Sequence, residues 1–201
     1  MLLVINPDHP EPRKIERAAL ALAAGEIIAY PTDTLYGLGC DLSNKRAIER
    51  LSSFKPTPKG KQFSFICPNL GDIAKYALVE NATYRLLRHL LPGPYTFILN
   101  ATRDVPRIVQ SKRKTVGIRV PKHPVPVALA AALGRPILST SATDHMGVAL
   151  IDTREIDDSY HGLAMVLDGG TGGEIPTTII DLTRSPVEIV REGAGAIDEF
   201  I

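Results

Sequence analysis

Four polar segments of the sequence each lie at one end of an apolar run that is typical of a buried strand. The segments are 30–39, 116–121, 138–143, and 176–178 together with 191–193. They carry hydroxyl groups, two carboxylates and two arginines. Any one of them could simply cap a turn, because Ser, Thr and Asp often do so at strand ends. Ligands of α/β sheets commonly bind where strands end, so the four together predict one shared binding site.

The strongest single indication of chemistry is Arg119, which stands inside the apolar strand sequence Val-Gly-Ile-Arg-Val. A guanidinium in such a strand needs an anion, because burial of an unpaired charge is very costly. The anion could belong to a ligand. It could also be Asp33, in which case Arg119 would be an ordinary structural arginine.

Several common catalytic patterns are missing from the sequence. It has neither the G-x-x-x-x-G-K-[ST] nor the G-x-G-x-x-G phosphate loop, and it has no G-x-S-x-G nucleophile motif. The glycine-rich run 169–173 is followed by no lysine and is typical of a flexible turn. Cys40 and Cys67 are expected to be small, buried, apolar side chains of a protein in a reducing compartment. An enzyme with this sequence would therefore act by positioning and charge neutralisation, as in reactions at phosphate.

Charge is distributed unevenly along the chain. Residues 144–201 hold 12 of the 22 acidic residues but only 3 of the 23 Lys and Arg, so the preceding part is basic. Basic residues are densest in 103–122, which indicates a phosphate or nucleic-acid partner nearby. For the run 112–114 a solvated loop without a partner explains the charges equally well.

The periodicity of apolar residues predicts the elements that must position these residues. Helical spacing indicates helices near 15–22, 47–54, 69–77, 81–91 and 125–132. Apolar runs indicate strands at the N-terminus and near 26–30, 63–67, 95–101, 116–120, 136–140, 164–168, 177–182 and 187–191. The pattern predicts an α/β (α+β) fold, with one twisted mixed sheet and helices packed on it, as a single domain over residues 1–201.

The remaining stretch, 143–162, is polar and aperiodic, which suggests a loop or a lid. No apolar run approaches the roughly 20 residues that span a bilayer. The N-terminal apolar run is too short for a signal peptide and lacks a basic start. We therefore expect a cytoplasmic protein without a membrane partner.

The order and content of these segments resemble the YrdC-like family, which includes threonylcarbamoyl-AMP synthases. The matching segments are 31–39, 92–96, 116–121, 139–142, 177–182 and 191–193. The resemblance implies a concave, positively charged face. It also implies that L-threonine, bicarbonate and ATP with Mg²⁺ react to give threonylcarbamoyl-AMP and pyrophosphate. This adenylate would serve the modification of tRNAs that read codons beginning with A, so other tRNA-modification proteins become candidate partners.

The resemblance also assigns residues to the two ligands. The residues expected to hold threonine are Thr34, Arg119, Ser139 and Thr177. The residues expected to contact the nucleotide are Lys55, Lys61, Thr115, Ser141, Thr143 and Arg191. No side chain is expected to bind metal directly, because Mg²⁺ would arrive on the nucleotide. Arg119 suits the carboxylate, because the guanidinium fork can bind that group through two hydrogen bonds. Thr177 could alternatively be an ordinary β-branched strand residue.

The sequence departs from the synthase pattern at the expected ATP site. Where the synthases carry K-x-R, this chain has Ser53 and Lys55 in place of the Lys and the Arg. Where the synthases carry S-x-N, this chain has Thr143 in place of the Asn. Lysine does not replace arginine where a planar fork must bind phosphates. These departures resemble the YciO branch of the family. The alternative function is therefore a paralogue without synthase activity that binds double-stranded RNA, tRNA or a nucleotide.

Overall fold

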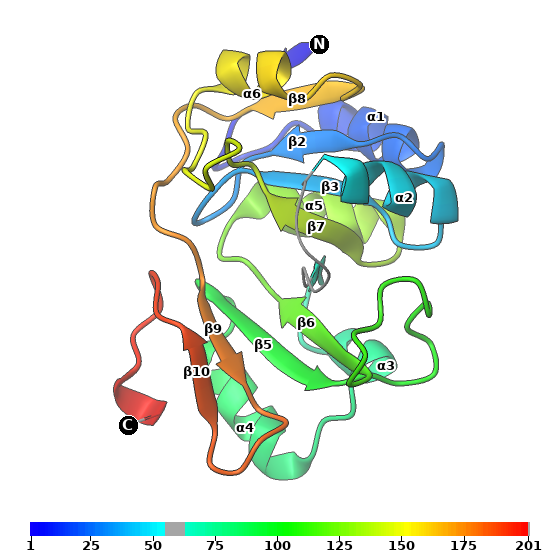
Figure 1. Ribbon diagram of the computed structural model, residues 1–201. Coiled ribbons are helices and arrows are strands. Elements are labelled where there is room, and N and C mark those ends of the chain that lie inside the picture. The colour runs from blue at the N-terminus through cyan, green and yellow to red at the C-terminus, as the bar shows by residue number, and fades with distance from the viewer. Residues whose placement is uncertain (55–62, 201) are drawn as a thin grey trace.

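The strands of the described residues join one continuous mixed sheet (Figure 1). The computed structural model describes residues 1–54 and 63–200. The strands in chain order are β1 (Leu2–Val4), β2 (Ile28–Tyr30), β3 (Gly37–Asp41), β4 (Ser64–Ile66), β5 (Tyr95–Asn100), β6 (Thr115–Arg119), β7 (Ile137–Ser141), β8 (Met165–Asp168), β9 (Thr178–Asp181) and β10 (Glu188–Arg191). Their order across the sheet is β1-β8-β2-β3-β7-β4-β6-β5-β9-β10. Parallel and antiparallel neighbours alternate irregularly, so the prediction of a single mixed sheet is confirmed.

Six α-helices lie among the described residues and cover both faces of the sheet. They are α1 (Pro12–Ala23), α2 (Lys45–Ser53), α3 (Ile73–Tyr76), α4 (Asn81–Leu90), α5 (Pro124–Leu133) and α6 (Thr153–Ser159). Each of the predicted helices is present, with bounds shifted by a few residues. None of the helices in the described part of the chain is both long and apolar enough to cross a membrane.

Two separate apolar cores lie on opposite faces of the sheet. Alternate residues of a strand point to opposite faces, and β2 follows this rule: Ile28 belongs to one core and Ala29 to the other. The first core takes the apolar stripes of α1 and α5, such as Leu22 and Leu129. The second core takes α2, α3 and α4. The two cores hold the strands from both faces of the sheet. The polar residues at the strand ends lie outside these cores and can form a site.

Two elements differ from the sequence prediction. Strand β3 lies within the segment that was expected to be a polar strand exit. Its Gly37 and Gly39 weaken the usual strand signal, but both positions pair with β2 and β7. Helix α6 lies in 143–162, where a loop or lid was expected. It is started by Asp152, whose carboxylate accepts hydrogen bonds from the amides of Arg154 and Glu155.

The sheet has two halves that meet at the short pairing of β7 with β4. Strands β1, β8, β2, β3 and β7 form one half, the upper one in Figure 1. Strands β4, β6, β5, β9 and β10 form the other half, and β6, β5, β9 and β10 are seen below in Figure 1. At the junction Ser64 stands opposite Ser139. The segment from β8 to β9 returns from the upper half to the lower half along one side (Figure 1). Residues of both halves therefore reach the space at the junction.

Candidate functional site

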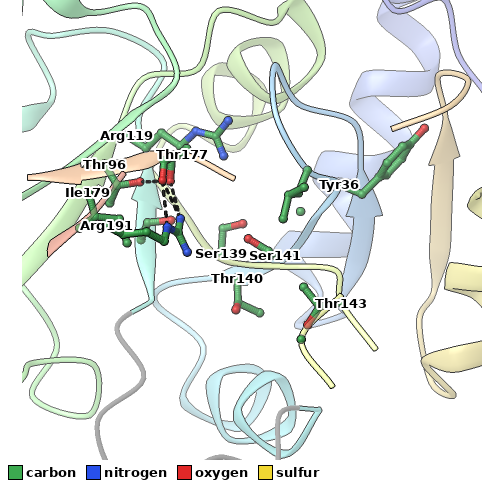
Figure 2. A pocket seen from close by; sticks show the side chains of 14 residues that line it. Tyr36, Thr96, Arg119, Ser139, Thr140, Ser141, Thr143, Thr177, Ile179 and Arg191 are labelled. Atoms are coloured by element: carbon green, nitrogen blue, oxygen red, sulfur yellow. Dashed lines mark hydrogen bonds between the residues drawn. The ribbon is translucent and has the colours of Figure 1, made fainter. Parts of the chain in front are cut away.

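A pocket of about 440 Å³ lies at the junction of the two halves of the sheet (Figure 2). Its lining comes from β3, β7 and the turn after β7 on one side, and from β4, β5, β6, β9 and β10 on the other. The lining residues are Leu35, Tyr36, Gly37, Ser64, Thr96, Arg119, Ser139, Thr140, Ser141, Thr143, Gly147, Thr177, Ile179 and Arg191. Most of the polar atoms are hydroxyls, and Arg119 and Arg191 are the cations among these residues.

Six residues that the sequence assigned to the two ligands line this one pocket. They are Arg119, Ser139, Ser141, Thr143, Thr177 and Arg191. Thr34 is not in the lining, but its hydroxyl accepts a hydrogen bond of 2.8 Å from Arg119 Nη2. The predicted convergence of polar strand ends is therefore present in the structure. The binding role of each residue remains a prediction.

Three assigned residues are not placed at the pocket. Thr115 starts β6, four residues before Arg119, and its hydroxyl lies 2.7 Å from Ser111 Oγ. At about 3.3 Å per strand residue, it stands on the order of 13 Å from Arg119 along the strand. Lys55 and Lys61 lie outside the described residues.

Arg119 is held by the turn that follows β2. Its Nη2 atom donates to the hydroxyls of Thr32 and Thr34 and to the carboxylate of Asp33. The other Asp33 oxygen accepts the backbone amide of Lys122 at 2.9 Å. The structure therefore contains the ion pair of Arg119 with Asp33, one of the two partners that the sequence suggested for this arginine. The buried Nε of Arg119 has no hydrogen-bond partner in the described structure, and all the hydrogen bonds of this guanidinium come from Nη2.

Arg191 and two threonines form a second polar group in the pocket. Arg191 donates through Nε and Nη2 to the carbonyl oxygen of Thr177, and its Nη2 also donates to the Thr177 hydroxyl at 3.0 Å. That hydroxyl lies 3.0 Å from Thr96 Oγ1 (Figure 2). Burial, and then the charge of Arg119, lower the pKa of Arg191 from its usual value. Two partly buried like charges in one pocket favour binding of an anion.

Sequence reasoning missed several lining residues, and Tyr36 is the most informative of them. Its hydroxyl donates to the carbonyl of Gly170 at 2.7 Å and accepts the amide of Gly169 at 3.1 Å. The amide of Gly173 donates to the carbonyl of Thr34 at 3.0 Å. The glycine run 169–173, expected to be a flexible turn, is therefore bonded to the pocket wall.

The chemical groups of the pocket suit binding rather than covalent catalysis. The two cysteines lie elsewhere, and burial raises the pKa of Cys40 and of Cys67 to about 12, which leaves both thiols protonated. No three His, Cys, Asp or Glu side chains in 1–54 and 63–200 are grouped to hold a metal ion. Hydroxyls and guanidinium groups are suited to bind a carboxylate or a phosphate.

The basic stretch 103–122 lies mostly away from the pocket. Arg103, Arg107, Lys112 and Lys114 are exposed on the connection between β5 and β6. Arg113 instead donates to the buried carboxylate of Asp181 at 2.9 Å. Within this stretch, only Arg119 therefore contributes to the pocket lining.

Comparison with known proteins finds relatives along nearly the whole chain. The family model Sua5_yciO_yrdC, described as "Telomere recombination", matches residues 20–193. The protein YciO of Escherichia coli K12 is 41% identical over 200 residues, which cover 98% of this chain and 97% of the relative. A threonylcarbamoyl-AMP synthase of Vibrio cholerae is 33% identical over 183 residues, which cover 89% of this chain and 97% of the synthase.

Two solved structures are similar to the whole fold. The crystal structure of E. coli YciO has a TM-score of 0.96 at 40% identity and covers 100% of this chain and 99% of that one. The crystal structure of P. abyssi Sua5 complexed with L-threonine has a TM-score of 0.91 at 26% identity. It covers 99% of this chain and 59% of the Sua5 chain.

Proposed function

Because the chain belongs to the Sua5/YciO/YrdC family, we propose that it binds L-threonine and ATP in the pocket between the two halves of its sheet. The reaction is formation of threonylcarbamoyl-AMP, or of a closely related adenylate. The product serves tRNA modification. The observation that carries the proposal is the meeting of Arg119 and Arg191 with the hydroxyls of Ser139, Ser141 and Thr177 in one pocket.

The proposed chemistry needs no nucleophilic side chain. The amino nitrogen of threonine attacks bicarbonate, and loss of water gives a carbamate. A carbamate oxygen then attacks the α-phosphorus of ATP, and the bond to the departing pyrophosphate breaks. The protein's share is to bind the anions side by side and to neutralise their charge, together with Mg²⁺ on the nucleotide.

Arg119 and Arg191 are placed for two different anions. Arg119 lines the pocket and uses only Nη2 in its hydrogen bonds among the described residues, so its Nη1 remains to bind a carboxylate oxygen of the amino acid. Arg191, on β10, lines the same pocket and would face the phosphates. The structure of Sua5 with L-threonine supports an amino acid as one ligand, because its fold matches this chain over almost its full length.

Pyrophosphate release tests the proposal directly. The protein is incubated with ATP, Mg²⁺, bicarbonate and L-threonine, and pyrophosphate is measured with and without the amino acid. Release is expected only when threonine and bicarbonate are both present, and mass spectrometry should detect the adenylate. Release that is absent, or that does not depend on threonine, would contradict the proposal.

The departures from the synthase pattern predict a reaction slower than that of the synthases. Thr143 lines the pocket, where Asn would offer both an amide donor and a carbonyl acceptor to the nucleotide. The triple variant Ser53→Lys, Lys55→Arg, Thr143→Asn restores the synthase residues, and we expect it to raise adenylate formation at least about tenfold, equivalent to about 1.4 kcal/mol of the barrier. The control is Lys45→Arg on the exposed side of α2, which should leave the rate unchanged.

The alternative function is RNA binding without synthase activity, and the exposed cations of 103–114 favour it. Phosphate contacts release counterions, so affinity for a double-stranded RNA should fall steeply as salt is raised. The paired variant Lys112→Ala, Lys114→Ala should weaken binding and reduce the salt slope. Undetectable or salt-independent binding would eliminate this alternative.

A further inference from the structure

The hydroxyl of Ser139 makes two hydrogen bonds inside the protein before any ligand binds. Ser139 lies on β7, is 4% exposed, and lines the pocket. The hydroxyl of Tyr30 donates to Ser139 Oγ at 2.6 Å. Ser139 Oγ in turn donates to the carbonyl oxygen of Leu38 at 3.3 Å. The direction of both hydrogen bonds is therefore set.

These two bonds determine what Ser139 can offer to a ligand. A serine hydroxyl has one hydrogen and two lone pairs. The hydrogen points to Leu38, and one lone pair is occupied by Tyr30. One lone pair remains, so Ser139 can accept a hydrogen bond from a ligand but has no hydrogen left to donate.

Tyr30 reaches Ser139 because two glycines leave space across β3. Tyr30 pairs with Gly37, and Gly39 pairs with Ser139, so β3 lies between the two hydrogen-bonded residues. A Cβ added at Gly37 would stand 2.9 Å from the Tyr30 ring, and one at Gly39 would stand 2.8 Å from it. The tyrosine ring therefore lies over the glycine backbone, and its hydroxyl meets the strand beyond.

Tyr30 acts through Ser139 rather than on a ligand. It is 0% exposed and is absent from the pocket lining. Burial raises the pKa of Tyr30, so the phenol keeps its proton and stays a donor at every physiological pH.

We propose that Tyr30 is a positioning residue that makes Ser139 a hydrogen-bond acceptor for an N–H or O–H group of the amino-acid substrate. This inference rests on the proposed binding of threonine. The amino and hydroxyl groups of threonine are both donors. A ligand that presents only acceptors at this point, such as a carboxylate oxygen, is disfavoured.

The first test is Tyr30→Phe, which keeps the ring and removes the donor. Ser139 is then free to rotate and to lose its acceptor orientation. We expect the KM for threonine to rise about fivefold, as for loss of one hydrogen bond, while the KM for ATP stays unchanged. The matched control is Tyr95→Phe, because the Tyr95 hydroxyl donates to the carbonyl of Ala196 outside the pocket lining. A general structural effect would change both KM values.

The second test identifies the donor with two analogues, measured by calorimetry. L-2-Aminobutyrate lacks the hydroxyl, and 3-hydroxybutyrate lacks the amino group. Tyr30→Phe should weaken the binding of threonine and of the analogue that keeps the donating group. It should leave the affinity for the analogue that lacks the donating group unchanged. Any other pattern overturns the proposal. If Tyr30→Phe does not fold, Ser139→Ala is measured on the same three ligands and must give the same pattern.

Wild-type binding separates the two hypotheses. If the wild-type protein binds no threonine, the proposed function is wrong and this inference is overturned with it. If the wild type binds threonine and Tyr30→Phe binds it equally well, only the role of Tyr30 is overturned.

Discussion

At the scale of single residues, the pocket depends on a buried ion pair. The side chains of Arg119 and Asp33 are only 9% and 12% exposed. Removing one partner of a buried pair leaves a charge without compensation, which costs on the order of 3–5 kcal/mol. We expect Asp33→Asn to lower the free energy of unfolding by about 3 kcal/mol in urea denaturation, since the hydroxyls of Thr32 and Thr34 still accept from Arg119.

An anion offers a check on the cause of this loss. Added acetate should stabilise Asp33→Asn more than the wild type, because its carboxylate supplies the missing negative charge near Arg119. Asp104→Asn, on the exposed loop after β5, is the control and should change stability by less than about 0.5 kcal/mol. If Asp33→Asn lowers the free energy of unfolding as little as Asp104→Asn does, the ion pair of Arg119 and Asp33 does not stabilise the fold as the structure indicates.

The sequence could predict which residues approach the pocket but not how they pair within it. Polar residues at strand ends indicated Arg119, Ser139 and Arg191, since strand ends meet at the sheet's edges and junctions. Thr115 was assigned from a motif alone, and the length of β6 places it away from the lining. Tyr30 opens the segment 30–39, but the sequence assigned it no role, because a tyrosine at the end of an apolar run is indistinguishable from a core residue until β3 is placed beside it.

At the scale of elements, β3 requires glycine. A Cβ at Gly39 would stand 2.5 Å from Ile137 Cγ2 and 2.8 Å from the Tyr30 ring, closer than atoms can pack. We expect Gly39→Ala to lower the free energy of unfolding by about 2 kcal/mol, as overpacking of a core does, measured in urea. Gly71→Ala is the control, because its Cβ would meet only the end of the Asn69 side chain. Equal stability of Gly39→Ala and the wild type would show that β3 does not lie as described.

The same glycines explain why β3 escaped prediction. Strand signals rest on β-branched and aromatic residues, whereas the strand Gly37–Asp41 offers mostly small ones. Its pairing depends on the distant strand β7, which local periodicity cannot reveal. Helix α6 escaped because it has only seven residues, too few for a clear helical period. Longer helices with one apolar face, such as α1 and α2, were predicted correctly.

At the scale of the whole molecule, two buried carboxylates link stability to pH. Burial alone would raise the pKa of Asp41, but hydrogen bonds from Arg135 and Ser43 outweigh it and hold the pKa below its usual value. Asp181 behaves in the same way beside Thr183 and Arg113. A lowered pKa in the folded state adds stability above the unfolded pKa of about 3.9, and this stability is lost as pH falls further.

Thermal unfolding between pH 7 and pH 3 should therefore show a falling Tm below about pH 4. Asp41→Asn should be less stable than the wild type at pH 7, and the difference should shrink as pH falls below about 4, because the carboxylate of the unfolded wild-type chain then becomes protonated. Glu16→Gln on the exposed side of α1 is the control and should follow the wild type at every pH. A difference between Asp41→Asn and the wild type that stays constant with pH would assign the loss to packing rather than to charge.

The position of the pocket predicts that a ligand bound there would contact both halves of the sheet. Ser139 and Ser141 belong to the upper half, and Thr177 and Arg191 belong to the lower half. Among the described strands, the halves pair directly only through the three residues of β4 against β7. A ligand that bonds to both sides adds a second link between them. Hydrogen exchange with threonine and ATP present should therefore slow together in 137–143 and 176–179. Exchange in α1, which contributes no residue to the pocket lining, should be unchanged. Protection confined to one half would show that the ligand does not bridge the junction, and the pocket would then be a cleft beside the site rather than the site itself.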